Sequence, residues 1–131
     1  MVNGQPSGAT IEYDPNATVG LSIRMPDTQG KITETSPIQD MPTNSALSLG
    51  HELIHADHIM SGGVSVAMAD HDFREGAITF RENHYSEEFR TVGFGGFTRS
   101  GDITENQLRR ELGMNPRAAY LSRPDWQQVT P

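Results

Sequence analysis

A strongly apolar segment near the middle of the chain, Ala46 to Met60, has the periodicity of an amphipathic helix. At about 100° of rotation per residue, its apolar side chains form one continuous stripe, made by Leu49, Leu53, Ala56 and Met60. We expect this stripe to face a hydrophobic core. Residues 43–45 offer alternative caps for the start of the helix, and Ser61-Gly62-Gly63 predicts its end.

Ahead of this helix the pattern predicts two short strands and a long loop. Residues 9–13 and 19–25 combine β-branched and apolar positions, and Asp14-Pro15-Asn16 between them is typical of a turn. Together these segments favour a hairpin. Residues 26–43 hold three prolines among many polar residues, which predicts a surface loop with at most a short strand near Ile32.

After the helix, two apolar and β-branched segments flank a polar centre. The segments are residues 64–69 and 77–81, and residues 70–76 between them would form the turn of a β-hairpin. A short helix is predicted next, over residues 86–92. Ser86 is its expected N-cap, and the acids of the first turn stand where the helix dipole favours them.

The C-terminal part of the chain contains one further helix and a tail. Residues 104–107 (TENQ) have the capping-box pattern and open a helix that stops at Gly113. Trp126 is expected to pin the tail. Because 131 residues is the length of one domain, we predict a single α+β domain over residues 1–131, with residues 1–8 as a flexible lead-in.

Composition narrows the range of partners. The net charge of −7, without any cluster of Lys or Arg, argues against a nucleic-acid or anionic-membrane partner, because basic side chains hold phosphates. The absence of cysteine leaves His and carboxylates as the strong metal ligands. The sequence shows neither the long apolar run of a membrane span nor the pattern of a cleavable signal peptide.

The central helix carries an H-E-x-x-H box, His51-Glu52-Leu53-Ile54-His55. Two imidazoles one turn apart can hold zinc while the glutamate activates water. Relative to His51, helix geometry puts His55 at about 40° and Glu52 at about 100°, so the three share one side. The pattern also arises by chance on ordinary amphipathic helices. Unpaired His and Glu would be costly to bury in so apolar a segment, however, and we therefore expect a zinc site.

A catalytic zinc site usually has a third protein ligand and keeps the fourth position for water. From the residues alone, the third ligand stays open among downstream histidines and acids: His58, His71, His84, Asp70, Asp72, Glu75, Glu82, Glu87, Glu88 and Glu105. His58 points in the right direction but lies about 4.5 Å of rise beyond His55. We expect it to support a metal ligand rather than to bind the metal.

Four segments resemble the motif series of bacterial effector zinc metallopeptidases, the injected type III effectors that cut host kinases. They are residues 50–62 (GHELIHADHIMSG), 87–93 (EEFRTVG), 103–106 (ITEN) and 117–120 (RAAY). The same set is similar to the light chains of the clostridial neurotoxins, whose helix also reads HELIHA. The injected-effector family is the closer match in size and in its I-T-E-N element.

This resemblance implies a role for two adjacent acids. In the light chains the second glutamate of the E-E-x-R-T-x-G segment is the third zinc ligand, and by this match it is Glu88. Glu87 would then support the ligands without binding zinc. A carboxylate on a second short helix is also a familiar completion of an H-E-x-x-H pair. Without the motif series, both acids would simply occupy the favourable first turn of a helix.

The resemblance also implies roles near the C-terminus. The light chains carry an R-x-x-Y that steadies the oxyanion of the transition state, and Arg117 and Tyr120 match it. An acid twelve positions before the arginine orients it, and Glu105 stands at that interval. A guanidinium and a phenol are suitable donors for the charge that develops on a peptide carbonyl. On local sequence alone, a surface arginine and a core tyrosine would be favoured.

Together the motifs predict a small zincin with its active-site helix beside a short sheet, acting as a zinc-dependent endopeptidase. Zinc on His51, His55 and Glu88 would lower the pKa of its water, and Glu52 would take the proton. The resemblance implies a secreted or injected toxin with a protein substrate in a target cell, and it leaves open a cognate immunity or inhibitor protein. Val92 replaces an aromatic residue of the light chains, and the substrate identity does not carry over.

Two rival hypotheses differ in class. A zinc-stabilised interaction domain would hold the metal for its fold, cut nothing, and have a closed fourth coordination position. A metal-free DNA-binding module would use residues 107–112 as a recognition helix, but the net charge of −7 argues against it.

Overall fold

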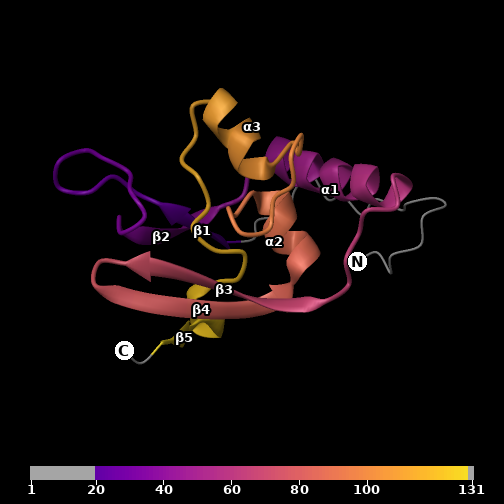
Figure 1. Cartoon of the computed structure of the whole chain (residues 1–131). Helices are drawn as coiled ribbons and strands as arrows, with labels where there is room; N and C mark the ends of the chain where they lie inside the picture. The colour runs from indigo at the N-terminus through magenta and orange to yellow at the C-terminus, as the bar shows by residue number, and fades with distance from the viewer. Residues whose placement is uncertain (1–19, 130–131) are drawn as a thin grey trace.

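The structure, a computed structural model, describes residues 20–129 (Figure 1). In chain order its helices and strands are β1 (Gly20–Arg24), β2 (Ile38–Pro42), α1 (Ser45–Met60), β3 (Met68–Glu75), β4 (Ile78–Tyr85), α2 (Ser86–Val92), α3 (Glu105–Glu111) and β5 (Gln127–Gln128). The strands form two antiparallel sheets, β1-β2 and β3-β4-β5. The three helices lie together on one side of the β3-β4 hairpin, as Figure 1 shows. The predicted α+β class is confirmed.

The first sheet confirms one predicted strand but gives it a different partner. β1 lies within residues 19–25, where a strand was expected. It pairs with β2, which lies within residues 26–43. The prediction of a loop over that whole segment is therefore wrong. The other half of the predicted hairpin, residues 9–13 with the turn at 14–16, lies outside the described residues.

β2 has the composition of a loop because most of its side chains face solvent. Its last residue is a proline, and Ile38 is the only fully buried residue of the strand. Ile38 joins the apolar cluster that contains Phe73 and Trp126, which no local pattern could indicate. The strand considered near Ile32 is not formed. Tertiary packing of one isoleucine thus decides where this strand forms.

α1 forms as predicted, with Asn44 as the N-cap that accepts hydrogen bonds from two backbone N–H groups of the first turn. The expected core-facing stripe is wrong. Leu53 and Met60 are 50% and 70% exposed, and of the stripe only Ala56 is buried. Most buried residues lie on the face that carries the histidines: Leu47, His51, Ile54, His55, His58 and Ile59. Acids from other helices pair with these histidines, so this polar face can be buried.

β3 and β4 form one long hairpin whose register runs from Met68 opposite Tyr85 to Glu75 opposite Ile78. The prediction of a turn over residues 70–76 is wrong, because almost all of that segment is strand. The turn is at Gly76, where the φ angle is +59°. The segment has the polar composition of a turn because its side chains form polar pairs with the opposite strand. Such cross-strand pairs stabilise a sheet without alternating apolar residues.

α2 and α3 begin and end close to their predicted positions. Tyr85, not Ser86, is the N-cap of α2, and it makes no side-chain capping bond, so the Ser86 assignment is wrong. Gly93 ends α2 with a φ angle of +109°, and a Cβ atom there would lie 2.7 Å from the Thr104 hydroxyl. Thr104 caps α3 by accepting from the N–H of Gln107, as the capping-box pattern predicts. The glycine thus lets the end of α2 meet the start of α3.

Two apolar clusters hold the elements together. The first consists of Ile38, Phe73, Ala118, Ala119 and Trp126, and the second of Phe89, Val92 and Phe94. Trp126 pins the C-terminal segment as expected: its indole N–H donates to the Leu121 carbonyl over 2.9 Å, and its ring lies 4.8 Å from that of Phe73. Within residues 20–129, no helix is long and apolar enough to cross a membrane.

We expect Trp126→Ala to lower the free energy of unfolding by about 3–5 kcal/mol, because it leaves a cavity against Phe73 and removes one of the two hydrogen bonds that the Leu121 carbonyl accepts. Urea unfolding followed by circular dichroism measures the change. Leu112→Ala is the control, since that side chain is 63% exposed, and it should change the value by less than about 0.5 kcal/mol. Equal effects of the two substitutions would contradict this role of Trp126.

Candidate metal centre

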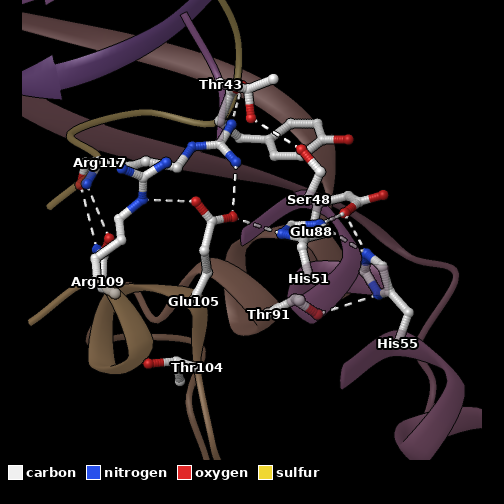
Figure 2. A network of polar contacts seen from close by, with 12 residues as sticks. Thr43, Ser48, His51, His55, Glu88, Thr91, Thr104, Glu105, Arg109 and Arg117 are labelled. Atoms are coloured by element: carbon white, nitrogen blue, oxygen red, sulfur yellow. Dashed lines mark hydrogen bonds and ion pairs between the residues drawn. The ribbon is translucent and has the colours of Figure 1, made fainter. Parts of the chain in front are cut away.

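Three possible ligand atoms from α1 and α2 converge on one buried point (Figure 2). The Nε2 atoms of His51 and His55 lie 3.0 Å apart. Glu88 Oε1 lies 3.0 Å from the first and 2.6 Å from the second. All three residues are buried, with 6–7% of their surface exposed. Of the third-ligand candidates in the described range, Glu88 is the one brought between both rings.

The opposite ring nitrogens of both histidines face other carboxylates. His51 Nδ1 lies 2.7 Å from Glu105 Oε1 on α3, and His55 Nδ1 lies 2.9 Å from Glu87 Oε2 on α2. An ionised carboxylate can only accept, so each Nδ1 must carry the proton. In a neutral ring the Nε2 atom then carries a lone pair, and the lone pairs of both rings point toward each other and toward Oε1 of Glu88. Three acceptors at this separation are favourable only with positive charge between them, either a proton on one ring or a bound cation.

The donor set fits a divalent transition metal such as zinc, because imidazole nitrogen and carboxylate oxygen are its ligands in proteins without cysteine. The pKa shifts of His55 and Glu88 also indicate that this group of atoms favours positive charge. Burial alone would lower the pKa of His55, but hydrogen bonds to Glu87 and Glu88 outweigh it and raise the pKa to about 9. Glu88 has its pKa depressed, since both rings counter the effect of burial on the carboxyl.

A second group of possible ligand atoms comes from His55, His58 and Glu87. Here Glu87 Oε2 accepts from Nδ1 of both rings, and the Thr91 hydroxyl lies 3.1 Å from the same oxygen. A neutral imidazole has only one lone pair, so His55 cannot serve this group and the first one together. The structure thus places His58 against Glu87, and Glu87 supports His55.

Glu105 connects the first group to the end of the chain, as Figure 2 shows. Its carboxylate accepts from His51, from Arg109 Nε over 2.8 Å and from Arg117 over 2.9 Å. Burial raises the pKa of Glu105, but the bond from His51 and the charge of Arg117 outweigh it and hold the pKa at about 2. α3 can approach α1 because Gly50 has no side chain: a Cβ atom there would lie 3.0 Å from Leu108.

A cavity of about 420 Å³ opens beside the ligand atoms. Its wall consists of Glu52, His55, Ile59, Val64, Ser65, Val66, His84, Tyr85, Glu87, Glu88 and Tyr120. Glu52 and Tyr120 thus share a cavity with the ligand atoms. Burial and the nearby charge of Glu88 raise the pKa of Tyr120, so its phenol remains a neutral hydrogen-bond donor over the physiological range.

Arg117 does not line this cavity. Its guanidinium is buried behind Tyr120, where it donates to Glu105 and, over 2.8 Å, to the backbone carbonyl of Tyr120 itself. Its carbon Cζ lies 5.3 Å from the centre of the Tyr120 ring. The resemblance implied that both residues face the reacting carbonyl. In this structure Tyr120 lines the cavity, while Arg117 donates to Glu105 and to the backbone of Tyr120.

The family model Peptidase_M91, described as effector protein, matches residues 2–120. The match covers most of the 131 residues and all four motif segments. The chain belongs to this family. Its membership in an effector peptidase family confirms the resemblance carried by the motifs. No curated protein and no solved structure matches the chain.

The structure adds Thr91, His84 and Tyr85 to the surroundings of the site of this effector peptidase, where the motifs gave them no role. Thr91 stands one helical turn after Glu87 on α2, a spacing that could have indicated their contact. His84 and Tyr85 reach the cavity from β4. His84 was open as a metal ligand, yet the structure places it on the wall instead, with its buried Nδ1 unpaired within the described residues. Only the fold brings β4 to the helices.

We expect the stability of the metal-free protein to be highest between pH 4.5 and 6.5. His55 has a raised pKa, so its contribution is full below 6.5 and is lost as the pH rises through about 9. Glu87 and Glu105 have lowered pKa values, so their contributions are full above 4.5 and are lost as the pH falls through about 2. Urea unfolding in EDTA at each pH tests this.

Added zinc should remove the alkaline loss, because the metal replaces the proton between the rings. A metal-free unfolding midpoint that stays constant from pH 6 to 9, the window of the His55 shift, would contradict the expected contribution.

Proposed function

We propose that this effector peptidase is a zinc-dependent endopeptidase that uses Glu52 as its general base. One observation carries the proposal: acceptor atoms of His51, His55 and Glu88 converge, and two of these residues, His55 and Glu88, line a cavity together with Glu52. The metal ligands of a purely structural zinc site close all four positions with protein groups. Here His55 and Glu88 border the cavity, which supports an open position where water and a peptide carbonyl would bind.

Each residue of the site would have a distinct task. Zinc bound by His51, His55 and Glu88 would supply a Lewis acid and lower the pKa of water beside it. Glu52 would accept the proton of the attacking water and pass it to the leaving amine. Tyr120 would donate a hydrogen bond to the developing oxyanion from its neutral phenol. Glu87 and Glu105 would hold the two rings in the tautomer that binds metal.

The cavity wall favours cleavage within a chain over removal of a C-terminal residue. Among the described residues its lining contains no Lys or Arg, the side chains that would hold a terminal carboxylate. Val64, Val66 and Tyr85 instead offer apolar surface to side chains of a bound peptide. Membership in an effector family supports a protein substrate in another cell. We infer that the protein acts after secretion or translocation into that cell.

We expect Glu88→Gln to lower zinc affinity by at least about 100-fold, because it removes the charged ligand of the three. Competition with a chromophoric chelator gives the affinity, and metal analysis of the purified protein gives the stoichiometry. Glu75→Gln is the control: Glu75 pairs with Arg123 and lies outside the cavity lining. Equal zinc affinity in both variants would show that Glu88 is not a ligand.

We expect Glu52→Gln to keep the zinc and lower kcat by at least about 100-fold, since an amide cannot accept the proton. The rate is measured on a quenched fluorescent peptide selected with the wild type, and cleavage is followed as new termini in a treated lysate. Asp57→Asn is the matched control on the exposed side of α1 and should retain the wild-type rate.

The same experiment separates the two functional hypotheses. If the wild type binds zinc but produces no new termini, and Glu52→Gln changes nothing, the protein is a zinc-stabilised interaction domain. A Glu52→Gln variant that cleaves at the wild-type rate would exclude Glu52 as the base.

A further inference from the structure

Glu82 is a buried carboxylate that takes no part in the metal-ligand network. It lies on β4 and is 1% exposed. Its Oε2 accepts from the backbone N–H of Tyr120 over 2.9 Å, and its Oε1 accepts from the N–H of Leu121 over 2.7 Å. Two consecutive amides of the C-terminal segment are therefore fixed to one side chain of the hairpin.

These bonds fix the backbone from which the Tyr120 side chain projects. Glu82 holds the N–H of Tyr120 while Arg117 holds its carbonyl, so the backbone is fixed on both sides of the Cα atom. The ring then lies stacked against His51, with centroids 6.2 Å apart, and tilted against His84 at 4.9 Å. The phenol consequently faces the cavity beside the ligand atoms.

Glu82 is itself fixed relative to α2. Its Oε2 also accepts from His71 Nδ1, directly opposite on β3, over 2.7 Å. The His71 ring stacks on Phe94 at 3.9 Å and contacts Phe89 of α2 at 5.3 Å. The same helix carries Glu88. The Glu82–His71 pair thus contacts both the backbone of Tyr120 and the helix that carries Glu88.

We propose that Glu82 is a positioning residue that holds Tyr120 in place for transition-state stabilisation. The role rests on the proposed function, because Tyr120 has a reacting carbonyl to stabilise only if the protein is a peptidase. An apolar side chain would fill this buried position at a lower desolvation cost than a carboxylate. What the carboxylate adds is two directed acceptors for consecutive N–H groups, which orient a segment that has no regular secondary structure of its own.

The test is a double-mutant cycle on the zinc-loaded full chain with Glu82→Gln, Tyr120→Phe and both together. Glutamine presents an NH₂ group in place of one acceptor oxygen, so the single remaining oxygen would have to accept from both amides, at 2.7 and 3.1 Å in this structure, and the 2.9 Å bond from the Tyr120 N–H to Oε2 is lost. We expect Glu82→Gln to lower kcat at least about 10-fold, with KM and zinc affinity within about twofold of the wild type. In the Tyr120→Phe background the same change should cost less than about twofold.

Glu75→Gln is the matched control. Glu75 lies on the same hairpin and also anchors the C-terminal segment, through Arg123 at 2.8 Å, but away from the cavity. We expect it to leave kcat unchanged. If Glu82→Gln lowers kcat by the same factor with and without the Tyr120 hydroxyl, Glu82 acts through general stability and the proposal is overturned.

Hydrogen exchange of the Tyr120 and Leu121 amides gives a result that needs no catalysis. Both should exchange at least about 10-fold faster in Glu82→Gln than in the wild type. Unchanged exchange overturns the proposal even if the protein cleaves peptides. A wild type that cleaves nothing refutes the proposed function instead, while accelerated exchange would still show that Glu82 anchors this segment. If Glu82→Gln does not fold, Glu82→Asp, which retracts the carboxylate by one methylene, replaces it in both measurements.

Discussion

The packing of the three helices is organised around three hydrogen-bond acceptor atoms that converge in the buried interior. The lone pairs of two imidazoles and a carboxylate oxygen lie within about 3 Å of one another, which is unfavourable unless positive charge lies between them. Glu87 and Glu105 direct these lone pairs by accepting the protons of the opposite ring nitrogens. Each acid belongs to a different helix, so its contact with a histidine of α1 links α2 or α3 to α1.

This arrangement explains how so small a chain keeps its centre polar. Hydrophobic residues make up only 34% of the sequence, and the buried apolar clusters do not include the candidate metal ligands. Paired charges replace apolar packing between the helices, which is tolerable because each buried acid accepts from at least one histidine or arginine. The hairpin contributes in the same way through Glu82, which fixes the backbone of Tyr120.

Several predictions from the pattern were wrong because side chains found partners on other elements, which a local pattern of apolar and polar residues does not show. On α1 the histidine face is buried by its acid partners, and Leu53 and Met60 are exposed. On the β3-β4 hairpin, polar cross-strand pairs made strand residues resemble a turn. The strand β2 formed inside a predicted loop because Ile38 finds a partner cluster distant in sequence.

The sequence by itself determined the elements that local chemistry specifies: the H-E-x-x-H helix, the two short helices with their acids, and the family that these motifs indicate. Local chemistry suffices there because caps, dipoles and one-turn spacing act within a few residues. Only the tertiary structure decided that Glu88 lies between both rings, that Arg117 lies behind Tyr120, and that Glu82 holds that segment. These contacts join residues more than thirty positions apart or depend on the cavity, and such geometry exists only once the helices have packed against the hairpin.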